Sequence, residues 1–231
     1  MLVKDWMSTN VITVDVQDTL QQAIKLSMEN RVSLLPVLEE GKLVGVVTDR
    51  DMKRASPSDA ALMDIQHILY HLSRLEVGAI MTRYPTTIPP DLTIEEAAAV
   101  LLNNKISGAP VVDEQGAIKG VITKNDLFRA MISLSGLSKR GVQFGLLLED
   151  RPGSIKEVTD ILRKHNARLV SILSSHDKSP GGYRHVYVRA YNVDRAMLPK
   201  VKEEIREVLK EKARLLYMVD HRENKREIYD E

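Results

Sequence analysis

The sequence predicts a mixed α/β (α+β) chain in two parts, a duplicated unit followed by a smaller domain in the order βαββαβ. Three observations support this fold class. Residues 1–130 align with themselves, apolar residues switch between strand-like and helix-like spacing, and this pattern changes after residue 141. A length of 231 residues suggests two domains rather than one, and 43% hydrophobic residues are enough to form buried cores.

Composition excludes several classes of protein. The chain has no cysteine, which rules out disulfides, thiolate metal sites and a cysteine nucleophile and agrees with a cytoplasmic location. Its formal net charge of +1 gives no general attraction to nucleic acid or anionic lipid. No apolar stretch reaches the ~18 residues that a membrane span needs, and residues 1–6 lack the pattern of a signal peptide. We therefore expect no membrane association.

The first part of the chain contains an internal repeat. Residues 7–40 align with themselves after a shift of 74, and residues 41–55 after a shift of 75, which gives 16 identities in 49 positions with one gap. The identities include Met7 with Met81, Pro36 with Pro110, Thr48 with Thr123, Asp51 with Asp126 and Arg54 with Arg129. A match of this extent predicts that one folding unit is duplicated.

Each copy predicts the order strand, helix, strand, strand, helix. β-branched runs predict the first strands, threonines are suitable N-caps for the first helices, and an acidic turn containing glycine closes each hairpin. In the first copy we expect strands at 11–14, 33–38 and 43–47, a helix after Thr19 and a helix entered through 48–51. In the second we expect strands at 86–88, 108–112 and 118–122, a helix after Thr93 and a helix entered through 123–126.

These motifs resemble the cystathionine-β-synthase (CBS) domain. The resemblance rests on the initial Met-Ser/Thr, on Pro-Val at 36–37 and 110–111, and on Gly-Val-Val/Ile-Thr-x-x-Asp at 45–51 and 120–126. Two copies in tandem resemble the paired CBS module over about residues 1–132. The resemblance implies that adenosine-containing ligands bind in clefts between the copies.

The strand-to-helix junctions carry residues suited to such a ligand. Thr48 and Asp51 can face one cleft, where the carboxylate can accept hydrogen bonds from ribose hydroxyls and the hydroxyl can donate to a phosphate or ribose oxygen. Arg50 and Lys124 are placed to neutralise phosphate near a helix N-terminus. Thr-x-x-Asp is also an ordinary helix cap that needs no ligand. The candidate ligand-binding residues are Thr13, Leu35, Pro36, Thr48, Arg50, Asp51, Thr87, Ala109, Pro110, Thr123, Lys124 and Asp126.

The segment 56–76 predicts a helix that connects the two copies. Ser58 is a suitable N-cap, and apolar residues follow at helical spacing. Asp64, His67 and His71 share one face of this helix, a geometry that could bind zinc. That face is polar and such histidine pairs are common on surfaces, so we expect no metal site.

After a linker at 133–141, residues 142–220 predict a ferredoxin-like βαββαβ domain. Its expected elements are strands at 142–148, 168–173, 183–190 and 213–219, with helices from 154 and at 197–210. Residues 221–231 are expected to form a charged C-terminal tail.

The loop 147–155, before the first helix of this domain, resembles the ACT domain over about residues 142–220. The resemblance implies amino-acid binding near the helix start, with Asp150, Gly153, Ser154 and Ile155 as candidate residues. Glycine allows a carboxylate to approach the helix N-terminus closely. The alternative is that Pro152 and Gly153 only shape a turn and that the domain dimerises.

A competing interpretation of this domain is an RNA-recognition motif, which has the same order of elements and stacks bases on strand aromatics. Side chains alternate along the third strand, with one face formed by Tyr183, His185, Tyr187, Arg189 and Tyr191. The first strand lacks a matching aromatic residue. We therefore favour another sheet as the partner of this face and expect no nucleic acid.

The predicted boundaries are 1–55 for CBS repeat 1, 56–76 for the connecting helix, 77–132 for CBS repeat 2, 133–141 for the linker, 142–220 for the ACT-like domain and 221–231 for the tail. The order is similar over the full chain to the acetoin-utilisation CBS–ACT proteins. This implies a non-enzymatic cytoplasmic regulator that binds AMP, ADP, ATP or a related adenosyl compound, requires no cofactor, forms a homodimer and acts on an unknown protein.

Two other functions stay open at this point. An enzyme would need a nucleophile-base pair or a metal cluster, and the six histidines match no such motif. A dimerisation scaffold with vestigial clefts would have the same fold but would not respond to ligand.

Overall fold

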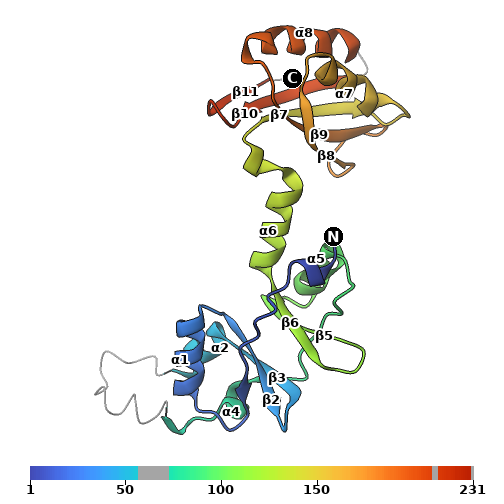
Figure 1. Cartoon of the computed structure of the whole chain (residues 1–231). Coiled ribbons are helices and arrows are strands. Elements are labelled where there is room, and N and C mark those ends of the chain that lie inside the picture. The colour runs from blue at the N-terminus through green and yellow to red at the C-terminus, as the bar shows by residue number, and fades with distance from the viewer. Residues whose placement is uncertain (57–72, 210–212, 230–231) are drawn as a thin grey trace. The chain divides into compact units, whose positions relative to one another are not determined.

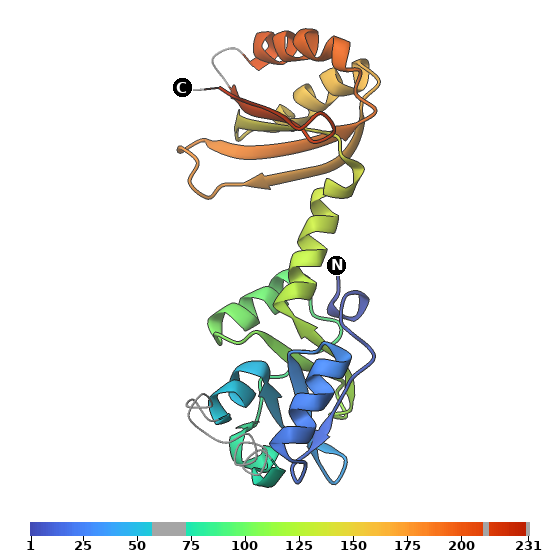
Figure 2. The same ribbon diagram turned by 90° about the vertical axis from the view of Figure 1, so that its left-hand side faces the viewer.

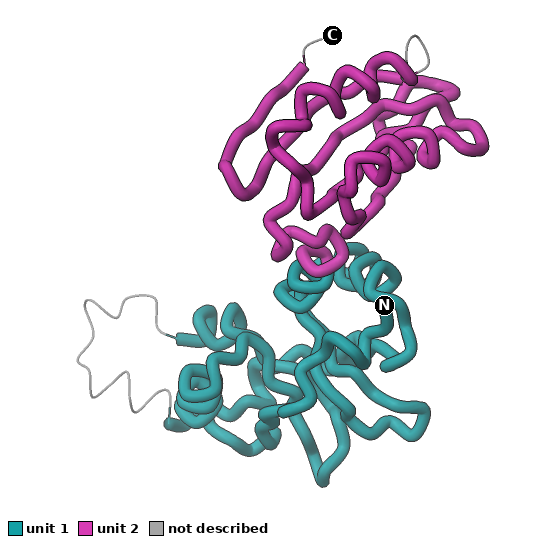
Figure 3. The backbone as a smooth tube through the Cα atoms, turned by 45° about the horizontal axis from the view of Figure 1, so that its top comes forward, with its two compact units in different colours: residues 1–130 teal, residues 131–231 magenta. Residues whose placement is uncertain are grey.

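The computed structural model describes residues 1–56, 73–209 and 213–229, and the chain divides into two compact units (Figure 3). Unit 1 is Met1–Ala130 and unit 2 is Met131–Glu231. Within the described residues, every helix is too short or too polar to cross a membrane. The predicted connecting helix lies largely outside them, and with it Ser58, Asp64, His67 and His71.

Unit 1 contains two similar halves, as the repeat predicts (Figure 1). The first comprises β1 (Val14–Asp15), α1 (Leu20–Asn30), β2 (Leu34–Glu39), β3 (Lys42–Thr48) and α2 (Asp49–Ala55). The second comprises α4 (Val77–Ile80), β4 (Thr82–Arg83), α5 (Ile94–Asn103), β5 (Gly108–Val112), β6 (Ile118–Thr123) and the start of α6 (Lys124–Ser135). The strand predicted at 86–88 is reduced to one parallel bridge between Ile88 and Val111.

The helix starts follow the predicted capping residues. Thr19 and Thr93 cap α1 and α5, and each accepts a hydrogen bond of 3.2 Å from a backbone N–H three residues later. The side chains of Gln22 and Glu96 bond back to the capping residues and complete capping boxes. These local signals determine where α1 and α5 begin.

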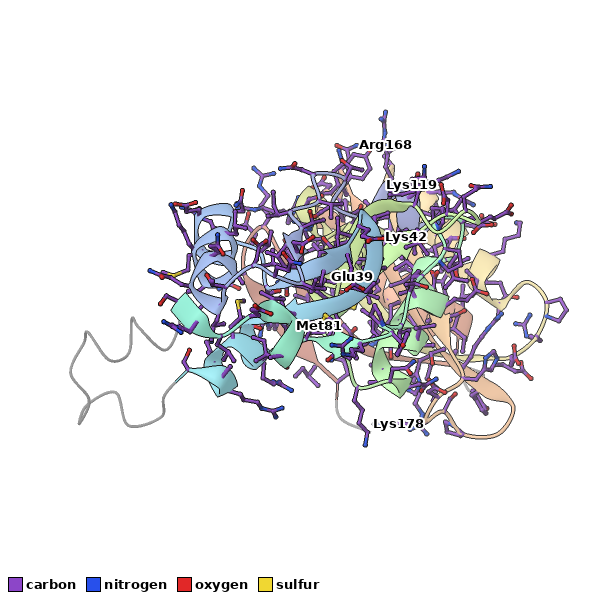
Figure 4. All side chains as sticks on the ribbon, turned by 90° about the horizontal axis from the view of Figure 1, so that it is seen from below. Glu39, Lys42, Met81, Lys119, Arg168 and Lys178 are labelled. Atoms are coloured by element: carbon purple, nitrogen blue, oxygen red, sulfur yellow. The ribbon has the colours of Figure 1, made fainter. Side chains whose placement is uncertain are left out.

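The two hairpins of unit 1 meet at its centre. β2 pairs antiparallel with β3, and β5 with β6. Glu39 and Lys42 are register partners at the end of the first hairpin and lie close together in Figure 4. Leu34, Val46 and Val121 form a small apolar cluster where the hairpins pack together. Each half also has its own core, around Leu35 in the first and Ile122 in the second.

Each half lends a short segment to the hairpin of the other. β4 of the second half pairs with β3 through Val46 and Thr82, and Ser8 of the first half bridges to Val121 of β6. At the N-terminus, η1 (Val3–Asp5) buries Val3 in the core of the second half. The halves are therefore interlocked rather than merely adjacent.

Unit 2 is a five-stranded antiparallel sheet with two helices on one face (Figures 1 and 2). The strand order is β11-β10-β7-β9-β8. Its elements are η2 (Leu137–Lys139), β7 (Val142–Glu149), α7 (Ser154–Lys164), β8 (Arg168–Ser175), β9 (Tyr183–Tyr191), η3 (Arg195–Met197), α8 (Leu198–Leu209), β10 (Ala213–Asp220) and β11 (Lys225–Ile228). The predicted βαββαβ order is present.

Two details of unit 2 differ from the prediction. The expected tail contains β11, whose Lys225 is the register partner of Asp220 in β10. The expected linker is partly helical, because α6 continues to Ser135 and η2 follows. The core of the unit is as the alternation predicts, since Val186, Val188 and Ala190 of β9 are all buried.

Candidate ligand-binding cleft

A cleft of about 720 Å³ lies within unit 1, between its two halves. One side is formed by the end of β3 and the start of α2, and the other by residues 84–86, residues 105–108 and the start of α6. We call it the Asp51 cleft. Five of the predicted ligand-binding residues line it: Thr48, Arg50, Asp51, Pro110 and Lys124.

The carboxylate of Asp51 is only half engaged. Its Oδ2 accepts hydrogen bonds from the backbone N–H of Thr48 at 2.9 Å and from the Thr48 hydroxyl at 2.6 Å. In return the Thr48 oxygen accepts from the backbone N–H of Asp51 at 3.3 Å, which caps α2. Among the described residues nothing donates to Oδ1. Capping and ligand binding are thus compatible, because the cap uses one carboxylate oxygen and leaves the other for a ligand.

The Asp51 cleft is rich in positive charge. Arg50, Arg54, Lys105 and Lys124 line it, and within the described part of the chain none of the four forms an ion pair. Lys53 also lines it, 3.7 Å from Asp49 in an exposed pair. The cationic side chains outnumber the acidic ones, so the cleft attracts anions despite the near-zero net charge of the chain.

Apolar and aromatic groups complete the cleft. Pro110, Leu34 and Val46 are buried and contribute to its wall. Tyr84 lies at the cleft with 92% of its surface exposed and a positive φ of 49°. An exposed ring beside a charged cleft offers a surface on which a planar base can stack.

Sequence reasoning missed Tyr84, Arg54, Lys105 and Ile106 of this cleft. The repeat gave no signal for Tyr84, because its counterpart in the first copy is Asn10. Arg54 carried a signal, since it is identical in both copies and lies one helical turn after Asp51. Lys105 and Ile106 reach the cleft only through the packing of one half on the other.

The other predicted residues lie elsewhere in unit 1. Leu35 and Ala109 are fully buried in the two cores. Thr87 lines a separate hollow of about 470 Å³ beside the β5–β6 turn. Thr13, Pro36, Thr123 and Asp126 do not line the Asp51 cleft either.

Asp126 occupies the position that matches Asp51 in the second half, but its carboxylate is fully engaged. The backbone N–H and the hydroxyl of Thr123 donate to Oδ2 at 2.7 and 2.6 Å. Arg129 binds Oδ1 in an ion pair. Asp126 is only 3% exposed. The two halves therefore present different carboxylates to their surroundings.

In unit 2 one arginine contacts two of the predicted ACT-loop residues. Arg184 lies 3.5 Å from Asp150 and donates to the hydroxyl of buried Ser154 at 3.2 Å. His176 also contacts Asp150 at 3.1 Å. Gly153 has a φ of +87° at the start of α7, a conformation that favours glycine, and Ile155 packs on the core. The small cavity behind this loop measures only about 10 Å³.

The face of the unit 2 sheet opposite α7 and α8 carries the predicted row of polar and aromatic side chains. Tyr187 lies between His185 and Tyr217, with ring centroids 6.3 and 6.4 Å apart. Arg189 is buried and donates to Gln143 at 2.8 Å, and burial lowers the pKa of its guanidinium. Burial also raises the pKa of Tyr217. These rings already contact one another, so the alternation alone does not identify an RNA-binding surface.

A metal site has no support in the parts of the chain that the structure describes. Across residues 1–56, 73–209 and 213–229, no three histidine or acidic side chains are grouped so as to hold a metal ion.

Family models match both parts of the chain. The CBS domain matches residues 3–58 and 77–133, and the ACT domain matches residues 142–210. Both resemblances predicted from the motifs are confirmed.

Relatives match mainly the first part of the chain. A CBS domain-containing protein of Dictyostelium discoideum is 33% identical over 135 residues, which are 58% of this chain and 93% of that protein. An uncharacterized protein of Methanocaldococcus jannaschii is 30% identical over 155 residues, covering 57% of this chain and 92% of that protein. An inosine-5'-monophosphate dehydrogenase of Korarchaeum cryptofilum is 31% identical, but the match covers 70% of this chain and only 33% of that enzyme.

Solved structures of CBS domain pairs also align with this part. The pair of protein MJ0100, in complex with 5'-methylthioadenosine and S-adenosyl-L-methionine, is 29% identical with a TM-score of 0.49, covering 57% of this chain and 95% of that one. The structure of CBSX2 in complex with AMP is 30% identical with a TM-score of 0.47, covering 57% and 96%.

Proposed function

The chain belongs to the CBS-domain family and carries an ACT domain, and from this premise we propose that it is a non-enzymatic regulatory protein that binds an adenosine-containing ligand in the Asp51 cleft. One observation carries the proposal. The free Oδ1 of Asp51 lies in a cleft between the repeats, where cationic side chains and an exposed aromatic ring also converge.

Each part of the ligand has a partner of suitable chemistry. Asp51 Oδ1 accepts hydrogen bonds from the ribose hydroxyls, and charge-assisted bonds of this kind are about twice as strong as neutral ones. Arg50 and Lys124, near the starts of α2 and α6, neutralise phosphate. Tyr84 and the apolar wall hold the adenine ring.

A ligand that binds one conformation of the protein more tightly than another shifts the protein toward that conformation. We propose that the chain works as a cytoplasmic homodimer and that this conformational change alters its interaction with another protein, as its resemblance to the acetoin-utilisation CBS–ACT proteins implies. Size-exclusion chromatography with light scattering, with and without AMP, tests the dimer. A monomer at micromolar concentration under both conditions contradicts it.

Amino-acid binding at the ACT loop is the second proposed activity. A Cβ built at Gly153 has no neighbour within 4 Å, so a carboxylate can approach the start of α7 there. Calorimetric titration with a panel of amino acids tests this activity. Saturable binding that Gly153→Val removes supports it, and the absence of heat across the panel contradicts it.

The decisive experiment on the Asp51 cleft is calorimetric titration of the full chain with AMP, ATP and S-adenosylmethionine. Asp51→Asn keeps the cap, because the amide oxygen can still accept from Thr48, but it turns an NH2 donor toward the ligand. We expect affinity to fall at least tenfold, which is about 1.4 kcal/mol. Asp91→Asn is the matched control, since Asp91 is exposed in unit 1 and does not line this cleft.

The competing functions give different results. A scaffold shows no heat with any of the three compounds and no rise in its melting temperature. An enzyme converts a bound nucleotide, and its turnover disappears in Asp51→Ala or Asp126→Ala. Either result contradicts the proposal of a non-enzymatic sensor.

A further inference from the structure

The two halves of unit 1 share a longer motif than the helix cap alone. Thr-x-x-Asp-x-x-Arg occurs at 48–54 and again at 123–129. The arginine follows the aspartate by three residues, so in a helix the two side chains lie on the same face. The threonine, aspartate and arginine that both halves share at equivalent positions predict equivalent contacts, and the structure departs from that expectation.

Arg129 and Arg54 make different contacts. Arg129 reaches back along α6 and binds Oδ1 of Asp126. Arg54 lines the Asp51 cleft and, within the described residues, forms no ion pair. The carboxylate oxygen that Asp51 leaves open is therefore the one that Arg129 covers on Asp126.

Breaking the ion pair between Arg129 and Asp126 is energetically unfavourable. The Asp126 side chain is 4% exposed, whereas that of Arg129 is 65% exposed. Breaking an ion pair with a buried member leaves its charge without compensation, which is strongly unfavourable. A ribose offers neutral hydroxyls in exchange for a guanidinium, so it does not displace Arg129 easily.

The charge in the Asp51 cleft also discriminates among adenosyl compounds. Four cationic side chains without ion pairs within the described residues line it, and Asp51 with Asp49 supplies the only carboxylates among the lining residues. Such a surplus attracts phosphate and repels the sulfonium and ammonium groups of S-adenosylmethionine. Neutral adenosine gains nothing from it.

We propose that the chain binds one phosphorylated adenosine ligand, at the Asp51 cleft, and that Arg129 prevents the equivalent position at Asp126 from binding a second. The inference rests on the proposed function and adds two properties to it, the stoichiometry and the charge class of the ligand. The Arg129 guanidinium binds the carboxylate oxygen of Asp126 that a ligand would otherwise bind.

Stoichiometry is tested by calorimetric titration of the full chain with ATP. We expect one site per chain in the wild type and none in Asp51→Asn at ATP concentrations that saturate the wild type. Arg129→Gln is expected to bind two, and Asp51→Asn with Arg129→Gln is expected to bind one, at the position that Arg129 covered. Arg54→Gln, the matched variant in the other half, is expected to keep one site and bind ATP at least threefold more weakly.

The charge class is tested by competition at constant ionic strength. We expect ATP to bind at least tenfold more tightly than adenosine or S-adenosylmethionine, with the advantage narrowing as salt screens the cleft. If S-adenosylmethionine binds as tightly as ATP or more tightly, the proposal that the cleft selects phosphorylated ligands is wrong. Two sites in the wild type, or a single site in Arg129→Gln with an unchanged melting temperature, overturn the role of Arg129. Failure of all three compounds to bind contradicts the proposed function instead.

Discussion

The sulfur of Met81 occupies the space into which a side chain at Gly45 would point. A Cβ built on Gly45 lies 2.5 Å from Met81 Sδ and 3.0 Å from the backbone oxygen of Thr82. The same relationship recurs between Gly120 and Met7, at 2.6 Å. Met7 and Met81, which are equivalent in the repeat, therefore each pack on the hairpin of the other half. This packing explains why both copies contain the same Met and the same Gly far apart in sequence.

Gly45→Ala is therefore expected to destabilise unit 1. Overpacking of a well-packed site typically costs about 1–3 kcal/mol, and the crowded backbone oxygen limits how far Met81 can relieve the clash. Urea unfolding followed by circular dichroism measures the change. Gly181→Ala is the control, because a Cβ there has no neighbour within 4 Å. Equal effects at the two glycines would mean that the contact between the halves does not limit stability.

The helices and strands of unit 1 could be predicted from the sequence because their signals are local. The capping threonines and the Pro-Val strands recur at fixed spacing in the repeat. Each threonine determines the start of a helix, and each Pro-Val pair marks a strand. β11 gave no such signal. It consists of Lys225–Ile228, mostly charged residues without apolar alternation, and it forms because β10 offers an edge and Lys202 lies 2.7 Å from Glu227.

The same distinction applies to the site. Thr48 and Asp51 were predicted because one short motif contains both. Tyr84 and Lys105 reach the cleft only when the second half folds against the first, which no spacing within one repeat reveals. The difference between Asp51 and Asp126 was also invisible, since both copies carry the same Thr-x-x-Asp-x-x-Arg pattern, while Arg129 pairs with Asp126 and Arg54 lines the cleft.

Tyr84→Ala is expected to weaken binding of AMP about tenfold. Stacking of a base on an aromatic side chain is worth about 1–3 kcal/mol, and the ring of Tyr84 is exposed at the cleft. Tyr84→Phe keeps the ring and is expected to bind within about twofold of wild type. Calorimetry with AMP measures both. If the two variants bind equally well, the ring does not contact adenine.

Arg195→Ala is expected to destabilise unit 2 by about 3 kcal/mol. Arg195 donates to both carboxylate oxygens of Asp220, at 2.9 and 3.1 Å, and Asp220 is 2% exposed. Burial by itself raises the pKa of Asp220, but Arg195 and the backbone N–H groups of Arg222 and Glu223 outweigh it and lower the pKa. Removing the arginine leaves a buried charge uncompensated.

A second substitution separates this effect from lost packing. In Arg195→Ala, adding Asp220→Asn removes the stranded charge, so part of the lost stability is expected to return. The free energy of unfolding of all four combinations, from urea titration, gives the coupling between the two residues. A double variant less stable than Arg195→Ala would indicate that the charge of Asp220 is not the source of the loss.

Glu227 links the stability of unit 2 to pH. Hydrogen bonds from Lys202, Tyr229 and Lys225 lower the pKa of Glu227 from 4.5 to about 2. Because the folded pKa lies below the unfolded one, the ionised carboxylate stabilises the fold above pH 4.5. This contribution declines as the pH falls through 4.5 and is gone below about 2. Glu227→Gln is therefore expected to lower the stability of unit 2 at pH 7. The stability of the variant is expected to fall less than that of the wild type between pH 4.5 and about 2.

The measurement is the urea midpoint of the C-terminal unit at several values of pH in the full chain. Glu203→Gln is the matched control, since Glu203 is an exposed carboxylate of α8 that forms no ion pair within the described residues. We expect the urea midpoint of Glu203→Gln to equal that of the wild type at every pH. The midpoint of Glu227→Gln is expected to be lower at neutral pH and to equal that of the wild type only in acid. A constant difference between Glu227→Gln and wild type from neutral to acid pH would show that the side chain stabilises β11 through packing rather than through its charge.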